Sequence, residues 1–158
     1  DRMLKVNVVA VGRHKDKWLA GGVEHYSKLL SRYAKLNIEI VTIGKAQSAL
    51  PPSELMKAEA VAISKHIKKG STIALTDRGR RFDSLAFAKH IEKLQIQSGG
   101  QVNFIIGGAH GLDKSITLEA LDLLSFSDFT FSHQLVRLLL LEQLYRAFSI
   151  LHNTDYHK

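Results

Sequence analysis

The chain has 158 residues, of which 45% are hydrophobic and 23% are charged, and this balance is typical of a folded globular protein. A chain of this length is expected to form a single domain, residues 1–158, around a core of its own. Cysteine is absent, which excludes disulfides and thiolate metal sites. The formal charge of +7 favours a polyanionic partner, although charge alone fits a merely soluble basic protein equally well.

The N-terminal apolar stretch, residues 5–12, reads as a strand and not as a signal peptide. Met3 is the expected natural start, with Asp1 and Arg2 as additions before it. The longest aliphatic run, at residues 138–141, is too short to span a bilayer. We therefore expect no membrane partner, and the absence of cysteine is compatible with a reducing cytoplasm.

Apolar runs and helical spacing alternate through the first half of the chain. Strands are predicted over residues 5–12 and 38–44, with a helix over 18–33 between them. The stretch 45–55 is the least regular, and Ser53 is expected to cap a helix over 54–68.

The second half continues the alternation and ends in a long helix. Asp113 is expected to cap a short helix that ends near residue 120. The remaining predictions are strands over 72–76, 101–108 and 123–127, a basic turn over 77–84, a helix over 84–97, and a final helix that follows residues 129–131 and closes the chain.

Strands separated by helices predict an α/β fold with a parallel sheet, and the lack of polar alternation indicates that helices cover both faces. Ligands of such sheets bind beyond the carboxyl ends of the strands. Three loops with unusual sequences follow predicted strands, at residues 75–81, 106–111 and 125–131. We expect them to meet at one site.

The sequence IIGGAHGLD places glycines at 107, 108 and 111, where the backbone can adopt positive φ and approach a ligand closely. The helix after Asp113 would direct its N-terminus at the same corner. The spacing is not that of the dinucleotide fingerprint G-x-G-x-x-G. A tight strand-to-helix turn explains the glycines equally well when they are considered alone.

Metal chemistry and serine hydrolysis are poorly supported. No two histidines stand four residues apart around a carboxylate on a predicted helix, and no G-x-S-x-G sequence is present. The isolated histidines at 110, 133, 152 and 157 are more typical of polar contacts than of metal ligands. We expect no metal.

The last helix is apolar nearly all round from residue 135 to 151, so it must be covered on more than one side. A symmetric homodimer would cover it, and a central position in a monomer is the alternative. Arg137 follows His133 by one helical turn. A buried guanidinium requires either an anionic ligand or a partner, for which Glu142 is the candidate.

The sequences IIGGAHGL, LSFSDFTFSHQLVRLLLLEQLYRAFSIL and YHK resemble the bacterial ribosomal RNA large-subunit methyltransferase H family, the YbeA type of the SPOUT superfamily. This resemblance implies N3 methylation of a pseudouridine in 23S ribosomal RNA, with S-adenosyl-L-methionine as donor, by a cytoplasmic homodimer acting on assembled ribosomes. It also implies an α/β-knot fold with a C-terminal trefoil knot, although chains generally avoid knots.

The resemblance assigns donor-binding residues by motif. They are Leu75, Gly107, Phe126, Ser127, Asp128, Phe129, Thr130 and Phe131, all in the three strand-end loops. The family often has Pro after the histidine of its F-x-H-x-x-x-R stretch, where this chain has Gln134.

Methyl transfer to an imide-like nitrogen requires loss of its proton and stabilisation of the anion that forms. Arg137 is the candidate for the electrostatic role and His133 for proton handling, while Tyr156 and His157 are expected to close over the target base, in their own subunit or across a dimer.

Basic residues at 13–17 and 77–81 are candidates for RNA phosphate contacts, with a solvated turn as the alternative for the second group. Rival functions are a SPOUT-type methyltransferase of another RNA, such as transfer RNA, and a non-catalytic RNA-binding dimer.

Overall fold

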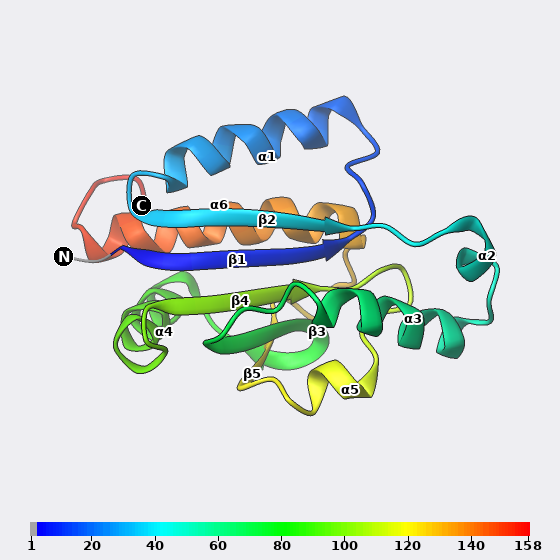
Figure 1. Ribbon diagram of the computed structural model, residues 1–158. Coiled ribbons are helices and arrows are strands. Elements are labelled where there is room, and N and C mark those ends of the chain that lie inside the picture. The colour runs from blue at the N-terminus through cyan, green and yellow to red at the C-terminus, as the bar shows by residue number, and fades with distance from the viewer. Residues whose placement is uncertain (1–2) are drawn as a thin grey trace.

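A computed structural model describes residues 3–158, and Asp1 and Arg2 lie outside the described residues. Five strands form one sheet in the order β2-β1-β4-β3-β5, with every paired strand parallel (Figure 1). The predicted α/β fold with a parallel sheet is confirmed. The elements are β1 (Leu4–Val11), α1 (Lys17–Leu30), β2 (Ala34–Val41), α2 (Lys45–Ser48), α3 (Pro52–Ser64), β3 (Ser71–Arg81), α4 (Ser84–Gln97), β4 (Gln101–Ile106), α5 (Lys114–Thr117), β5 (Asp122–Ser125) and α6 (His133–Leu151).

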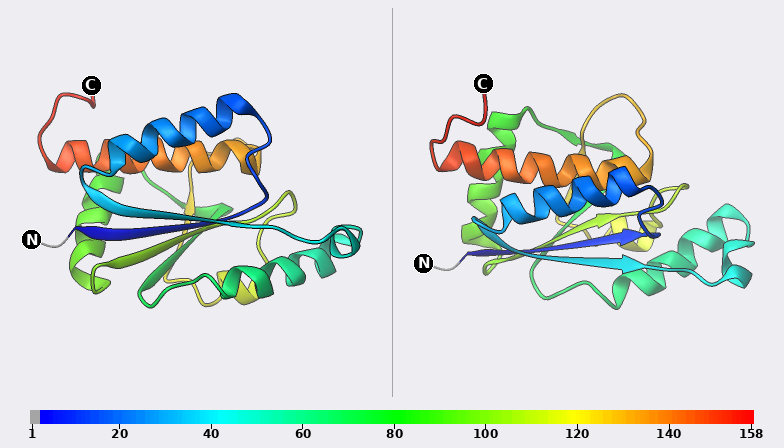
Figure 2. Two further views of the ribbon diagram at one scale, coloured as in Figure 1. Left: turned by 45° about the horizontal axis from the view of Figure 1, so that its top comes forward. Right: turned by 90° about the horizontal axis from the view of Figure 1, so that it is seen from above.

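Helices cover both faces of the sheet (Figure 2). Helices α1, α4 and α6 lie on one face, where Val8 and Phe104 join the larger apolar core. Helices α3 and α5 lie on the other, where Val9 and Ile105 join a smaller core. Because neighbouring strand residues point to opposite faces, strands buried on both sides need apolar residues at successive positions. No helix within residues 3–158 combines the length and the apolar character needed to cross a bilayer.

Two predicted starts in the first half of the chain are wrong, those of the second strand and of the second helix. Strand β2 begins at Ala34 and not at residue 38, because buried Ala34 already pairs with Leu4 and the ladder follows β1 along its whole length. Helix α3 begins at Pro52 after the N-cap Pro51, and no side chain caps it, so Ser53 is not the cap. Proline suits this position because its fixed φ matches the first helical turn. The irregular stretch also contains the short helix α2.

Strand β3 does not end in the expected basic turn but runs to Arg81. Its register breaks between Leu75 and Arg80, and both of these residues pair with Leu124 of β5. At Gly79 the chain lies against the β5 backbone so closely that a Cβ would be 2.5 Å from the carbonyl carbon of Leu124. The segment between the two pairings therefore passes directly over β5.

The C-terminal third follows the predicted order with two shorter elements. Asp113 caps α5 as expected, but the helix is a single turn that ends at Thr117. Strand β5 ends at Ser125. The long last helix is confirmed as α6, and the Ser132 hydroxyl accepts a 3.1 Å hydrogen bond from the Leu135 amide at its start.

A row of three asparagines crosses the sheet on the α3 face, with Asn37, Asn7 and Asn103 paired in register on β2, β1 and β4. The Asn7 amide donates to the Asn103 side-chain oxygen at 2.8 Å, and Asn37 donates to Asn7 at 2.8 Å. Asn103 also accepts from the Lys68 amide at 2.9 Å and donates to the Lys68 carbonyl at 2.8 Å. The row fixes the chain between α3 and β3 to the sheet.

Candidate functional site

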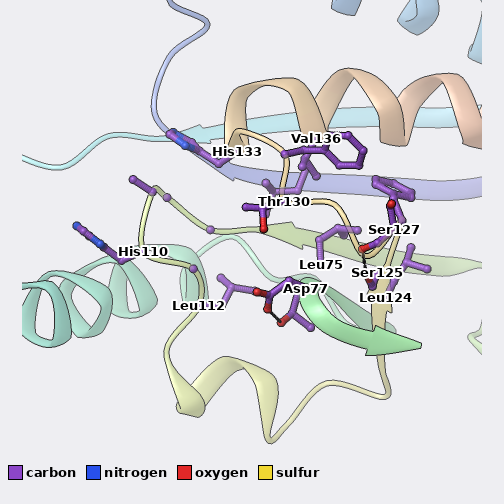
Figure 3. Close-up of a pocket in the computed structure, with 18 of the residues that line it drawn as sticks. Leu75, Asp77, His110, Leu112, Leu124, Ser125, Ser127, Thr130, His133 and Val136 are labelled. Carbon is purple, nitrogen blue, oxygen red and sulfur yellow. Dashed lines mark hydrogen bonds between the residues drawn. The ribbon is translucent and has the colours of Figure 1, made fainter. Parts of the chain in front are cut away.

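A cleft of about 270 Å³ opens at the carboxyl edge of the sheet (Figure 3). It lies where β4 and β5 end and where the register of β3 breaks after Leu75, and the first residues of α6 close one side. Residues from all three predicted loops therefore meet here, although the segment 75–81 is part of β3 and not a loop. The lining residues are Leu75, Thr76, Asp77, Ile106, Gly107, Gly108, Ala109, His110, Gly111, Leu112, Leu124, Ser125, Phe126, Ser127, Phe129, Thr130, Phe131, His133 and Val136.

The glycine corner, residues 107–111, forms one wall of the cleft by folding back on itself. The Gly111 amide donates to the Gly108 carbonyl at 3.1 Å. A Cβ at Gly107 would lie 2.7 Å from the Gly111 carbonyl oxygen, so a side chain there would disrupt the corner. Gly111 alone among the three glycines has positive φ, at +87°. The corner thus presents backbone rather than side chains to a ligand.

The loop after β5 forms the opposite wall, and hydrogen bonds within it set its shape. The Ser125 hydroxyl donates to the Ser127 carbonyl at 3.0 Å, and the Ser127 hydroxyl accepts from the Phe129 amide at 3.0 Å. Asp128 points away: its side chain is 87% exposed and pairs with Arg81. The cleft therefore has no contribution from Asp128.

Seven of the eight residues predicted to bind the donor line this cleft, and Asp128 does not. Leu112, Leu124 and Val136 also line the cleft, and they lie outside the three predicted loops. Thr76 and Asp77 belong to the segment 75–81 that the strand-end rule places at the site, although no ligand contact is predicted for either residue. Asp77 matters chemically, since it places a carboxylate in a cleft whose other walls are largely apolar or hydroxyl-bearing.

His133, the first residue of α6, lines the cleft beside Thr130 and Val136 (Figure 3). Burial lowers the pKa of its imidazole, and the positive charges of Arg137 and Lys15 lower it further. The ring is therefore neutral at pH 7 and able to accept a proton.

Arg137 does not line the cleft: it is 2% exposed and lies behind His133. Its guanidinium donates to the carbonyl oxygens of Gly12 at 2.7 Å and Val11 at 3.0 Å, and it lies 3.3 Å from His14 Nδ1. Nε has no hydrogen-bond partner among the described residues. Burial lowers the pKa of the guanidinium. The side chain holds the end of β1 against α6.

Glu142 is not the partner of Arg137, so that expectation is wrong. Its carboxylate instead accepts hydrogen bonds from Arg146 at 2.8 Å and from the Tyr156 hydroxyl at 2.8 Å. His157 Nδ1 lies 3.0 Å from Arg146. These contacts place the C-terminal tail over the second half of α6.

The predicted catalytic residues therefore fall into two separate groups. His133 and Arg137 lie near the cleft, at the start of α6. Tyr156 and His157 lie near Glu142, which is nine residues further along the helix, or about 14 Å at 1.5 Å per residue. The views agree that the C-terminus lies near the opposite end of the sheet (Figures 1 and 2). Within one chain the tail does not reach the cleft.

The donor set of the site is not that of a metal centre. Within residues 3–158 no group of three or more His, Asp or Glu side chains is arranged to hold a metal ion. Backbone, hydroxyls, apolar side chains, two imidazoles and one carboxylate line the cleft instead. Such a lining is typical of an α/β protein that binds an organic ligand at the strand ends.

Comparison with known proteins identifies the family to which this α/β protein belongs. Residues 4–157 match the protein family described as "Predicted SPOUT methyltransferase". The chain belongs to the SPOUT methyltransferase family, and the membership predicted from its motifs is confirmed.

Full-length relatives carry one common name. The "Ribosomal RNA large subunit methyltransferase H" of Natranaerobius thermophilus is 44% identical over 98% of this chain and 99% of its own length. Proteins of the same name from Acetivibrio thermocellus and Desulforamulus reducens are 41% and 38% identical, over 98% and 99% of this chain and all of theirs. The similarity covers the cleft, α6 and nearly the whole tail.

Proposed function

We propose that this protein is a ribosomal RNA methyltransferase that methylates N3 of a pseudouridine in the 23S RNA of assembled ribosomes, with S-adenosyl-L-methionine as donor. The observation that carries the proposal is the single cleft built by β3 at its register break and by the loops after β4 and β5. Membership of a methyltransferase family and relatives named for large-subunit ribosomal RNA support it. The pseudouridine and the assembled ribosome follow from the motif resemblance.

The residues of the cleft fit such a donor. The glycine corner offers backbone without interfering Cβ atoms, and Leu75 and Leu112 supply apolar walls. Asp77 offers a carboxylate to a cationic ligand. When bound, S-adenosyl-L-methionine supplies a methyl group on a positively charged sulfur.

His133 is the proposed proton acceptor. The target nitrogen must lose its proton, and a neutral imidazole beside the cleft can accept it. Arg137 acts indirectly, because its positive charge lowers the pKa of His133 although its own side chain does not line the cleft. Its electrostatic role is therefore proposed to pass through His133.

The C-terminal trefoil knot is part of the proposal, and β3 supports it. Leu75 and Arg80 both pair with Leu124, and Gly79 packs on the β5 backbone between those pairings. The β3 segment from Leu75 to Arg80 is paired with β5 at both of its ends and crosses β5 in between. We infer that this segment is part of a loop, and that β5 and the residues after it pass through that loop.

A homodimer is the second structural part of the proposal. Leu135, Leu138 and Leu139 of α6 are only partly buried, so an apolar stripe stays accessible in a single chain. A second copy would cover this stripe. It could also bring its Tyr156 and His157 to the cleft that the chain's own tail does not reach. Sedimentation velocity should give a dimer mass, and a monomer at micromolar concentration would contradict this part.

RNA contacts are proposed for two exposed basic segments. Arg13, Lys15 and Lys17 follow β1, while Arg78 and Arg80 belong to the β3 extension. The guanidinium of Arg80 lies 4.6 Å from the centre of the Phe82 ring, which positions it on the surface. Binding to ribosomes should weaken steeply as salt rises, because phosphate contacts release counterions.

The experiment that tests the function is transfer of labelled methyl from S-adenosyl-L-methionine to ribosomes, protein-free 23S RNA and transfer RNA. Label in the 23S RNA of ribosomes, located at N3 of a pseudouridine by mass spectrometry, is the expected result. Label in transfer RNA alone would identify a different RNA methyltransferase. Ribosome binding without heat on titration with S-adenosyl-L-methionine would instead indicate a non-catalytic RNA-binding protein.

A further inference from the structure

Glu59 of α3 is a buried carboxylate on the face of the sheet opposite α6. Its residue is 7% exposed, and its neighbours Ala60 and Ile63 belong to the smaller apolar core. No ion pair within residues 3–158 includes it. Burial raises the pKa of the carboxyl group, while His110 and the Gly108 amide act in the opposite direction. A buried carboxylate is destabilising unless it makes compensating interactions, so its position needs an explanation.

The carboxylate lies directly against the glycine corner. A Cβ at Gly108 would be 2.7 Å from Oε2 of Glu59 and 3.2 Å from Oε1. The φ angle of Gly108 is not in the positive region, so its lack of a side chain serves this close approach and not the turn. The carboxylate occupies the space that a side chain at position 108 would need.

Glu59 contacts the corner from the side away from the ligand. Gly108 and His110 line the cleft, whereas Glu59 does not. His110 is exposed and lies on the side of the corner near α3 (Figure 3). One buried side chain thus packs against the wall that a ligand would contact.

We propose that Glu59 is a positioning residue for donor binding: from α3, its carboxylate packs against Gly108 so that the corner keeps the shape the donor requires. The identity of the donor rests on the proposed function, but the hold on the corner does not. Without the carboxylate, the corner is expected to sample other conformations. Only the fraction of molecules in the native conformation can then bind the donor, so the apparent affinity falls.

The first test compares Glu59→Ala with Glu59→Gln, and uses Glu54→Ala as the control on an exposed position of the same helix. We expect Glu59→Ala to raise the Kd for S-adenosyl-L-methionine about tenfold, because the corner loses the side chain that packs against Gly108. Glu59→Gln keeps an acceptor oxygen and should recover most of the affinity. Amide exchange in the ligand-free protein should accelerate at residues 107–111 in the alanine variant alone. Unchanged Kd and unchanged exchange in Glu59→Ala would overturn the proposal.

The second test uses Gly108→Ala, whose methyl group would displace the carboxylate. Alone it should weaken donor binding at least as much as Glu59→Ala does. In the Glu59→Ala background the space is open, so the added effect of Gly108→Ala should be several-fold smaller. Full additivity of the two effects would show that the residues act independently. This cycle remains informative if either single variant is less stable than the wild type.

Failure of the two proposals can be distinguished. If the wild-type protein binds no S-adenosyl-L-methionine, the proposed function fails, while the exchange data at residues 107–111 still decide whether Glu59 holds the corner. If the wild-type protein binds the donor and Glu59→Ala binds it equally well with wild-type exchange, only the role of Glu59 fails.

Discussion

The guanidinium of Arg137, in the second turn of α6, donates a 2.7 Å hydrogen bond to the carbonyl oxygen of Gly12, just beyond β1. The two residues are 125 positions apart, and this bond and its neighbour at Val11 join the start of the last helix to the carboxyl end of β1. His133, one turn earlier, lines the cleft. The arginine therefore supports both the fold and the electrostatics of the site.

Arg137→Ala should abolish most methylation and also destabilise the fold. Two carbonyl groups lose a charged donor, and the free energy of unfolding should fall by about 3 kcal/mol. Urea unfolding and methyl transfer on the same preparation measure both effects. Arg32→Ala, at an exposed position, is the matched control and should change neither. Near-wild-type turnover in a folded Arg137→Ala variant would remove this residue from the mechanism.

The stability of the protein should fall as the pH decreases from about 7 to 5. Burial and the charge of Arg137 lower the pKa of both His14 and His133 below the ordinary value of 6.5. The unfolded chain therefore binds more protons than the folded chain once the pH falls through 6.5, and protonation favours unfolding. The contribution of these two histidines to the free energy of unfolding is fully present above pH 6.5 and is lost as the pH falls below that value.

The measurement is urea unfolding at pH 7.5 and 5.5 for the wild type and for the double variant His14→Gln, His133→Gln. The double variant should show a smaller loss of stability between the two pH values. His25→Gln, at an exposed position, should keep the wild-type difference. An equal pH effect in the double variant would mean that other groups cause it.

Replacement of Asn103 by Leu should destabilise the protein by about 3 kcal/mol, because buried polar groups of Asn7 and Lys68 would lose their partners. Asn37→Ala removes only the exposed end of the same row and should cost less than about 1 kcal/mol. Thermal and urea unfolding of the two variants test this difference. Equal effects would contradict the structural role of the buried centre.

The meeting of Leu75, Gly107 and Phe131 in one cleft could be predicted from the sequence, although these residues are far apart in the chain. Apolar strands separated by helices specify a parallel sheet, and parallel strands end at one edge. Motif resemblance then identified which loops mattered. Local patterns were sufficient because the rule depends only on the order of the elements.

The partners of Arg137 and Glu59 could not be predicted in this way. Arg137 bonds backbone carbonyls, and a carbonyl leaves no residue type to recognise in a sequence. Glu59 meets Gly108 across two elements that no periodicity relates. Asp128 lies in the expected loop, but a motif that assigns the whole segment 126–131 does not say which of its side chains face outward. The partners of Arg137 and Glu59 and the orientation of Asp128 all depend on contacts between atoms that are far apart in the sequence.

Gln134→Pro, which introduces the residue common in the family, should preserve the helix but loosen the loop after β1. Position 134 is in the first turn of α6, where proline is tolerated. The Gln134 amide donates to the Arg13 carbonyl at 3.0 Å, and its oxygen accepts from the Lys15 amide at 3.4 Å. Amide exchange over residues 13–17 should accelerate, while stability changes by less than about 1 kcal/mol. Unchanged exchange would show that other contacts hold this loop.

Deletion of residues 156–158 should reduce methylation far more than donor binding. Tyr156 contacts Glu142, about 14 Å along α6 from His133, so the tail is outside its own cleft. Calorimetry should give a donor Kd within about threefold of the wild-type value, a change of less than 1 kcal/mol. Equal loss of binding and activity would assign the tail a structural role. Tyr156→Phe is the milder variant, because it removes only the hydroxyl that donates to Glu142.

Mixed dimers then decide which cleft the tail serves. One chain would lack residues 156–158 but keep His133, and the other would be full-length with His133→Ala. If the tail acts across the dimer, the intact cleft of the first chain receives the tail of the second, and one site of the two works. The purified heterodimer should then show about half of the wild-type activity, although each parent homodimer is inactive. No activity above the parents would mean that each tail serves its own chain, which would require it to leave Glu142 and Arg146 and cross half the length of α6.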